Sequence, residues 1–355
     1  MTLPFDIFGI GKGPKSYLGV DVGTLSIKIA ELANENGRPK LLNYVVLSNY
    51  NLVENKSPKA FGGEAPIMLR RALKESGMAA KEINMSVPIF SSFLTVMELP
   101  PMPASEVASA IQFEAKKYIT VPLESVLIDW SMVESASDLP AQAGKISILL
   151  IAIPKDLVNE YSAIAREADL KLVNLELETM SAARALIGND PVPAVLVDMG
   201  SRDTTISVVS GGRPIISHSI ETSGEDLTRA LANSLNINWR RAEELKKEQG
   251  LRTMDSNAQV SGVLIPLLDV ILGAVKNIID IYSSKAGKKI EKLIIYGGAA
   301  KMPGFAEYLK SGLGLDVLIG NPFSKIIHDE KLNPVMKDIG HEFAIAVGLA
   351  LKAIQ

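Results

Sequence analysis

Two segments, one in each half of the chain, end an apolar run with the same short turn of an acidic residue, glycine and a hydroxyl residue. They are YLGVDVGTLSIKIAEL and AVLVDMGSRDTTISVVS, with Asp21 and Asp198, Gly23 and Gly200, and Thr24 and Ser201 in equivalent positions. Each apolar run predicts a buried strand, and each turn leads directly into a second strand. A unit repeated in this way predicts a duplicated fold with a cleft between its halves.

Each turn has the chemistry of a phosphate site. Its glycine lacks a Cβ, so backbone N–H groups can approach an anion closely, and the hydroxyl of Thr24 or Ser201 adds a donor. Asp21 and Asp198 are candidates to hold a hydrated divalent cation between two phosphates. Ser26 and Lys28 follow in the first copy, where the ammonium group is expected to reach a phosphate. A single turn of this kind is more often purely structural.

A third motif, LIIYGGAAKMPGF at 293–305, is a buried strand followed by paired glycines and a helix. Gly297 and Gly298, with Ala299 and Met302 after them, predict the close backbone approach that a ribose or purine needs. Alone, paired glycines also fit a tight connection between a strand and a helix.

Short apolar runs alternate with helical periodicity along most of the chain, which predicts an α/β fold. In the first part the expected elements are strands at 17–22, 26–32 and 40–48 and a helix at 65–76 that ends near Gly77. A compact α+β unit is expected at about 83–177, with helices that open at Ser105 and at Lys155. The stretch 134–144 is polar and aperiodic, which predicts an exposed hairpin loop.

Composition excludes several classes of function. The 355 residues carry a formal net charge of −3, so recruitment of nucleic acid or anionic membrane by bulk charge is not expected. With no cysteine and three histidines, the chain has no disulfides, thiolate sites or multi-histidine metal centres. Pro266 and Asp269 interrupt one of the two longest apolar stretches, so no membrane span is expected. The amino terminus lacks the pattern of a signal peptide, and a flexible leader at 1–16 and a cytoplasmic location are therefore expected.

Taken together, the three motifs resemble the phosphate-1, phosphate-2 and adenosine motifs of the superfamily that includes actin, heat-shock chaperone ATPase domains, sugar kinases and FtsA. The segments SGEDLTRAL, with Gly224, and AEELKKEQG, with Glu243 and Lys246, resemble further parts of its nucleotide site. The resemblance implies that Glu243 and Lys246 lie near the adenine and ribose, and that Glu178, with Asp198, orients the attacking water. It also implies the actin-like ATPase fold, two duplicated RNase H-like domains with a nucleotide cleft between them.

Within this superfamily, the inserted α+β unit, the start KSYLGVDVG and the end soon after the helix at 342–353 resemble the PilM family of type IV pilus assembly proteins. The domains implied are a first actin-like domain at 17–190, a second at 191–340, and a carboxy-terminal helix at 341–355 that returns to the first. The resemblance also implies ATP and Mg²⁺ as ligands, the cytoplasmic amino-terminal peptide of PilN as partner, and a position at the inner membrane through that partner.

Three departures from the superfamily pattern predict binding of ATP with slow or absent hydrolysis. Thr179 stands where many relatives have proline, Ser223 replaces a glycine, and SRDTT is less rich in glycine than the usual second loop. The alternatives are a filament-forming cell-division ATPase like FtsA and an actin-fold small-molecule kinase, and self-association stays open. Aromatic residues of the inserted unit are more often core than peptide groove, so no groove residue is assigned; they are Phe90, Phe93, Phe113 and Trp130.

Overall fold

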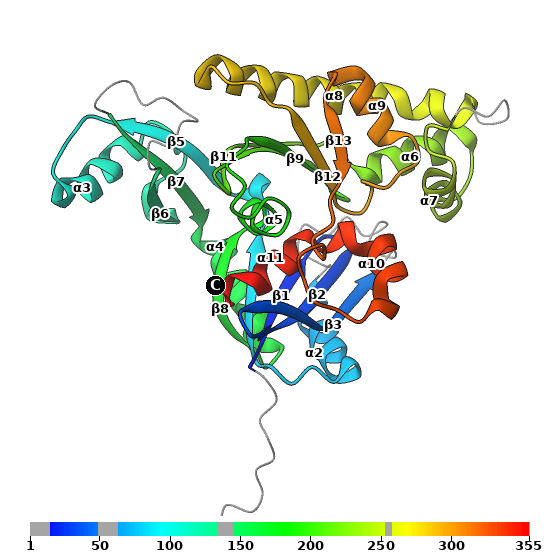
Figure 1. Ribbon diagram of the computed structural model, residues 1–355, viewed down its shortest axis with the longest axis horizontal. Helices are drawn as coiled ribbons and strands as arrows, with labels where there is room; N and C mark the ends of the chain where they lie inside the picture. Colours follow the sequence, from blue (N-terminus) through cyan, green and yellow to red (C-terminus); the bar gives the residue numbers. More distant parts are fainter. Residues whose placement is uncertain (1–14, 49–62, 134–144, 253–257, 355) are drawn as a thin grey trace, which may run out of the picture.

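The computed structural model describes residues 15–48, 63–133, 145–252 and 258–354. Most of the predicted leader and the whole predicted loop at 134–144 lie outside the described residues. The described chain forms two lobes, each built on a five-stranded sheet, and a smaller unit beside them (Figure 1).

The two large sheets have the same topology. The lobe 1 sheet has the order β3-β2-β1-β4-β8, formed by β1 (Ser16–Val22), β2 (Ser26–Glu35), β3 (Arg38–Ser48), β4 (Glu82–Val87) and β8 (Lys171–Leu177). The lobe 2 sheet has the order β11-β10-β9-β12-β13, formed by β9 (Ala194–Met199), β10 (Thr204–Ser210), β11 (Arg213–Ile220), β12 (Lys292–Tyr296) and β13 (Asp316–Ile319). In both, the first three strands are an antiparallel meander and the last two run parallel to the first. The duplication predicted from the two repeated turns therefore extends to the whole sheet of each lobe.

The third sheet belongs to the inserted subdomain, which comprises β5 (Phe93–Leu99), α3 (Ala104–Ala115), β6 (Val126–Val133) and β7 (Ile146–Pro154). Its order is β5-β7-β6, and α3 covers one face through Val107 and Ile111. The predicted unit of 83–177 was wider than this, because its first and last strands, β4 and β8, pair within the lobe 1 sheet. The short helix η2 (Ile89–Ser91) leads into the subdomain, and α4 (Lys155–Glu167) leads out of it.

Helices cover both faces of the lobe 1 sheet. On one face, α2 (Ala65–Ser76) and α4 pack against the apolar side chains of β1 and β4. On the other lie α5 (Glu178–Leu186) and α11 (Ala344–Lys352), which run between the two sheets in Figure 1. A Cβ on Gly19 of β1 would overlap the carbonyl oxygen of Ala346, and one on Gly348 would overlap that of Ser181. These glycines let α11 contact β1 and α5 backbone to backbone.

The chain returns to lobe 1 earlier than the predicted boundary at residue 340. Phe323, Ile326 and Met336 pack with Leu41 of β3, and the backbones of Leu41 and Ile327 are joined by a 2.8 Å hydrogen bond. The segment η4 (Glu330–Leu332), α10 (Asn333–Ile339) and η5 (Gly340–Phe343) then leads into α11. Apolar contact with lobe 1, rather than sequence pattern, sets this boundary.

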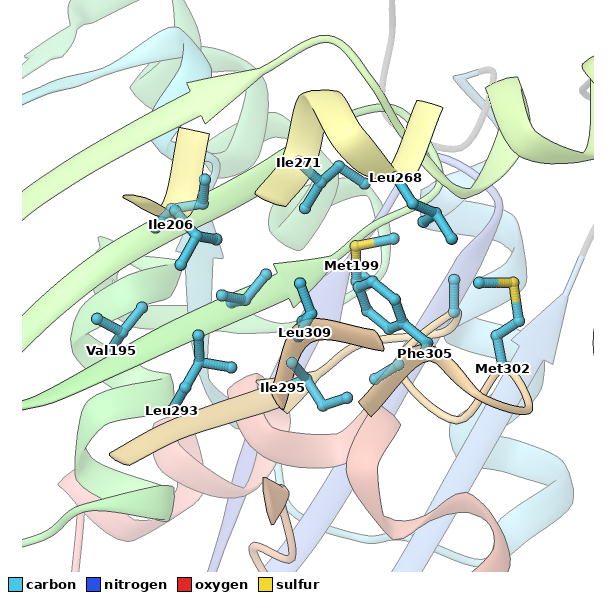
Figure 2. Packing of buried hydrophobic residues seen from close by; sticks show 14 of the residues in the cluster. Val195, Met199, Ile206, Leu268, Ile271, Leu293, Ile295, Met302, Phe305 and Leu309 are labelled. Carbon is cyan, nitrogen blue, oxygen red and sulfur yellow. The ribbon is translucent and has the colours of Figure 1, made fainter. Parts of the chain in front are cut away.

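Lobe 2 is covered by α6 (Gly224–Leu235), α7 (Trp239–Glu248), α8 (Ala258–Ala286) and α9 (Phe305–Leu313). By length and composition alone, α8 is long and apolar enough over Gln259–Ala286 to cross a membrane, a test that core helices also pass. One of its faces, however, carries Leu268 and Ile271 into the core of lobe 2 (Figure 2). That packing is typical of a core helix of a globular domain.

Candidate nucleotide-binding site

A pocket lies between the lobes, where the two repeated turns face each other. It is lined by nearly all the site residues predicted from sequence: Asp21, Gly23, Thr24, Ser26, Lys28, Glu178, Asp198, Gly200, Ser201, Gly224, Glu243, Lys246, Gly297, Gly298 and Ala299. The exception is Met302, which is buried in the lobe 2 core with Phe305 and does not line the pocket (Figure 2).

The first turn is closed by a 3.0 Å hydrogen bond from the Gly23 N–H to the Ser26 carbonyl oxygen. It presents Asp21, whose carboxylate accepts a 3.3 Å hydrogen bond from the hydroxyl of Ser86 on β4. Burial raises the pKa of Asp21, while the charge of Lys28 opposes that rise. Lys28 lies opposite Asp21 in the strand pairing, and its ammonium is 4.0 Å from the carboxylate of Glu342. The turn therefore brings one cation and one carboxylate to the pocket floor.

The second turn is docked on the amino-terminal end of α6. The Gly224 N–H donates to the Gly200 carbonyl oxygen at 2.9 Å, and the Glu225 N–H donates to that of Ser201 at 3.1 Å. A Cβ on Gly224 would lie 3.0 Å from the Gly200 oxygen, which is tighter than most real contacts. Glycine at this position thus permits the loop and helix to pack closely.

Asp203 adds a carboxylate to the second turn that sequence reasoning did not single out. It lines the pocket, and the hydroxyl of Thr205 donates to it at 3.0 Å. Burial raises the pKa of Asp203, and its hydrogen bonds with Thr205 and Ser219 oppose that rise. Its position three residues after Gly200, inside the motif, was the available signal.

Four carboxylates line the end of the pocket formed by the two turns, which is the phosphate end predicted from sequence: Asp21, Glu178, Asp198 and Asp203. Burial is the main cause that raises the pKa of Glu178 and of Asp198, and the charge of Asp203 is the next in both cases. So much negative charge in a buried site favours a bound cation. Among the described residues no group of three or more acidic or histidine side chains has the arrangement of a metal cage. Mg²⁺ nevertheless fits, because it takes one or two protein carboxylates and completes its shell with phosphate and water.

Glu178 is the first residue of α5, and its Oε1 accepts a 3.0 Å hydrogen bond from the Ile89 N–H of η2. The hydroxyl of Thr205 lies 3.5 Å from the same oxygen. These contacts hold the carboxylate at the phosphate end, where a raised pKa suits a group that accepts a proton from water near neutral pH.

The two glycines of the third motif serve different purposes. Gly297 has a φ of +90°, and a Cβ there would overlap the carboxylate of Asp198, so its glycine is required by the fold itself. Gly298 faces open space in the pocket, and a Cβ at this residue would meet no other part of the protein within 4 Å. Gly298 is therefore the position at which a nucleoside can approach the backbone.

Glu243 and Lys246 form a largely buried pair, although Glu-Lys pairs on helices are usually solvated surface. The Lys246 ammonium donates to the Gly224 carbonyl oxygen at 2.8 Å and to the Thr228 hydroxyl at 2.7 Å, and it lies 2.7 Å from the Glu243 carboxylate. These three contacts match the three N–H bonds of the ammonium group. Lys246 thus ties α7 to α6 and positions Gly224, while Trp239 at the start of α7 adds an aromatic side chain to the same lining.

Three further aromatic residues line the pocket: Phe90 of η2, Tyr161 of α4 and Tyr296 of β12, the last of which lies inside the third motif, directly before Gly297. Tyr296 is hydrogen-bonded to Asp198, and burial followed by the surrounding carboxylates raises the pKa of Tyr296 well above its ordinary value. No sequence pattern marks Phe90 or Tyr161, because only the packing of the lobes brings them to the cleft.

Comparisons with known proteins agree with this geometry. The chain is 17% identical over 350 residues to the cell division protein FtsA of Streptococcus pneumoniae serotype 2 (strain D39 / NCTC 7466), covering 86% of this chain and 75% of that protein. It is 21% identical over 240 residues to FtsA of Bacillus subtilis (strain 168), covering 59% of this chain and 54% of that protein.

Several solved structures share the fold. One, described as a PilM-PilN type IV pilus biogenesis complex, superposes with a TM-score of 0.82 at 22% identity, covering 96% of this chain and 98% of the other. MreB5 of Spiroplasma citri bound to AMPPNP superposes with a TM-score of 0.56 at 13% identity, covering 96% of each chain. The fold is thus the actin-like ATPase fold, and the family model for the type IV pilus assembly protein PilM matches residues 19–354. The chain therefore belongs to the PilM family of type IV pilus assembly proteins.

Proposed function

We propose that the chain is the ATP-binding component of the type IV pilus assembly machinery and a nucleotide-dependent scaffold for the cytoplasmic amino-terminal peptide of PilN. The observation that carries the proposal is the convergence of the two repeated turns, one from each lobe, on the pocket that Gly298 also lines. Two glycine turns facing each other can enclose a polyphosphate from both sides. Membership of the PilM family supports the assembly role, and the similar complex with PilN supports the choice of partner.

Each part of the nucleotide has a matching part of the pocket. Backbone N–H groups and hydroxyls at Thr24 and Ser201 suit the phosphates, and the open backbone at Gly298 suits the nucleoside. Asp21 and Asp198 would hold Mg²⁺ through its hydration shell, and the ion would offset the negative charge where the triphosphate meets the carboxylates. The similar MreB5 structure has AMPPNP bound, which supports a nucleoside triphosphate as ligand.

The inserted subdomain is the proposed peptide-binding unit. It exposes apolar side chains that a peptide can cover, including Phe113 at 70%, Leu127 at 49% and Met132 at 42% exposure. Phe93 and Trp130, by contrast, are half-buried and pack against its core. Binding of a membrane-anchored partner there would place this cytoplasmic protein at the inner membrane.

Two contacts link this subdomain to the pocket and to lobe 2. Ile89, just before β5, is hydrogen-bonded to Glu178 at the phosphate end. Arg213 of lobe 2 donates to the Met132 carbonyl oxygen of β6 at 3.2 Å. A change in the angle between the lobes therefore acts on the subdomain from two sides, and peptide affinity is expected to depend on the bound nucleotide.

Nucleotide binding is tested by calorimetric titration of the purified protein with ATP in the presence of Mg²⁺ or of chelator. The variants Asp21→Asn and Asp198→Asn remove the proposed metal-side charges with little change in shape. Both are expected to weaken binding at least tenfold, while Asp316→Asn, which removes an exposed carboxylate of β13, leaves it unchanged. Wild-type affinity in both pocket variants, with native circular dichroism, would refute the phosphate assignment.

The partner is tested by titrating a synthetic PilN amino-terminal peptide into protein that is nucleotide-free or saturated with ATP. A several-fold difference in peptide affinity between the two states is expected, and the peptide must change ATP affinity by the same factor. Identical curves would leave a passive peptide scaffold. Rapid steady-state release of phosphate would instead favour an enzyme.

A further inference from the structure

Tyr161 is a pocket residue that the proposed binding scheme does not yet use. It lies on α4, and its ring packs among the buried side chains of lobe 1, where the residue is only 3% exposed. It also lines the pocket, close enough to Asp21 and Glu178 for their charges to raise the pKa of Tyr161 after the larger effect of burial. The hydroxyl therefore remains protonated at neutral pH and acts as a hydrogen-bond donor.

This donor has no acceptor in the described part of the protein. The hydroxyl of Ser86 donates to Asp21, and the Ile89 N–H donates to Glu178, but no hydrogen bond joins either carboxylate to Tyr161. Tyr296, the other buried tyrosine of the pocket, is by contrast hydrogen-bonded to Asp198. Buried tyrosine hydroxyls normally have a partner, so the hydroxyl of a residue that lines a ligand pocket is expected to find one in the ligand or its water.

The position of Tyr161 indicates which part of the nucleotide would accept this hydrogen bond. Two of its three charged neighbours, Asp21 of the first turn and Glu178 of α5, lie at the phosphate end of the pocket; the third is Glu160 of α4 itself, and the glycines for the nucleoside belong to lobe 2. An uncharged donor suits this place, because it binds a phosphate oxygen without a further desolvated charge. A phosphate oxygen is negatively charged, so it forms a stronger hydrogen bond with a neutral hydroxyl than an uncharged acceptor does.

Tyr161 is also tied to the inserted subdomain. Helix α4 begins at Lys155, directly after Pro154 ends β7, the central strand of the three-stranded sheet. Tyr161 lies two turns into this helix, so a ligand bonded to its hydroxyl is connected to the central strand by continuous regular structure.

We propose that the Tyr161 hydroxyl donates a hydrogen bond to the terminal phosphate of bound ATP, directly or through one water, and makes the pocket distinguish ATP from ADP. The inference rests on the proposed ATP binding. ADP lacks the terminal phosphate and therefore offers the hydroxyl no acceptor at this position. The same bond makes α4 a route by which the inserted subdomain responds to the triphosphate and not to the diphosphate.

The test compares affinities for AMPPNP and ADP, both with Mg²⁺, in wild-type protein and in Tyr161→Phe. Phenylalanine keeps the buried ring and removes only the hydroxyl. The variant is expected to bind AMPPNP about tenfold more weakly and ADP within twofold of wild type. The matched control, Tyr44→Phe, alters a tyrosine whose ring packs on Phe343 and which does not line the pocket, and it should change neither affinity.

Equal weakening of both nucleotides would show that Tyr161 only shapes the pocket, and no change in either would remove the hydroxyl from the site; both results overturn the inference. Wild-type protein that binds neither nucleotide would overturn the proposed function as well. A second measurement is independent of the variant's stability. In protein labelled with 3-fluorotyrosine, the fluorine resonance of Tyr161 should shift with AMPPNP and not with ADP, and identical spectra would contradict the bond.

Discussion

The backbone N–H of Ile89 donates a 3.0 Å hydrogen bond to Oε1 of Glu178. Ile89 begins the short helix that enters the inserted subdomain, and Glu178 begins the helix that connects the two lobes. One carboxylate thus holds the subdomain entrance while it faces the phosphate end of the pocket.

The two roles of Glu178 can be separated by substitution. Glu178→Gln keeps an oxygen for the Ile89 N–H but removes the charge that would orient and accept a proton from water, so it should abolish any residual hydrolysis and preserve the coupling of peptide to nucleotide. Glu178→Ala removes the acceptor as well and should lose both. Phosphate release and reciprocal titrations of peptide and ATP measure the two effects. Equal coupling in the alanine variant would show that this hydrogen bond does not carry the signal.

Gly298 offers a direct test of the nucleoside position. In Gly298→Val the new side chain occupies open pocket space, so the protein should fold normally and bind ATP about a hundredfold more weakly. Gly262→Val places the same side chain on the exposed side of α8, also in open space, and should bind ATP as wild type does. Calorimetry decides between them. A folded Gly298→Val protein with unchanged ATP affinity would show that the third motif is only a tight connection between a strand and a helix.

The ionised carboxylate of Asp203 is expected to lower the free energy of unfolding of the nucleotide-free protein. Its pKa is raised in the folded state, chiefly by burial, so the ionised carboxylate opposes folding once the pH exceeds the unfolded value of about 3.9. Asp203→Asn should therefore raise the free energy of unfolding by about 1 kcal/mol at pH 7. The gain should shrink as the pH falls toward 3.9 and vanish below it, because the carboxyl is then protonated in both states.

Urea denaturation of both proteins at several pH values measures this difference. Asp316→Asn, which changes an exposed aspartate in the same lobe, serves as the control and should show no comparable gain at pH 7. A loss of stability in Asp203→Asn at neutral pH would mean that its hydrogen bond with Thr205 outweighs the burial of its charge.

Gly348 marks the crossing of the two helices between the lobes. A Cβ there would overlap the backbone of Ser181, so Gly348→Ala should force α11 away from α5 and destabilise the protein by roughly 3 kcal/mol. Gly273→Ala is the matched helical control, because a Cβ there meets open space and alanine is the better helix former. Thermal unfolding compares the two. Similar melting temperatures of the two variants would show that α11 and α5 can move apart to accommodate a Cβ at little energetic cost.

Much of the fold follows from local sequence signals. The predicted strands at 17–22 and 26–32 correspond to β1 and β2, and the helix predicted at 65–76 has the bounds of α2, with Gly77 in the left-handed conformation at its end. These predictions succeed because apolar periodicity and a terminal glycine act within a few residues of one another. The paired turns with Asp21 and Asp198 were predictable for the same reason.

What the sequence could not supply depends on partners far along the chain. The sequence pattern of β4 and β8 predicts strands but does not say which sheet they join. Their place in the lobe 1 sheet, and hence the limits of the inserted subdomain, therefore cannot be derived from that pattern. Met302 follows the glycines closely in sequence, yet its side chain turns into the lobe 2 core. Tyr161 reaches the pocket only because α4 packs on lobe 1.

The contact between Gly19 and α11 also bears on how the protein is made. β1 leaves the ribosome well before α11, the helix that covers it at Ala346. Lobe 2 has its whole sheet between Ala194 and Ile319, so it can close its core while the chain is still growing. Lobe 1 must keep one apolar face of its sheet uncovered until α11 has been synthesised, so we expect a chaperone to bind that face during synthesis.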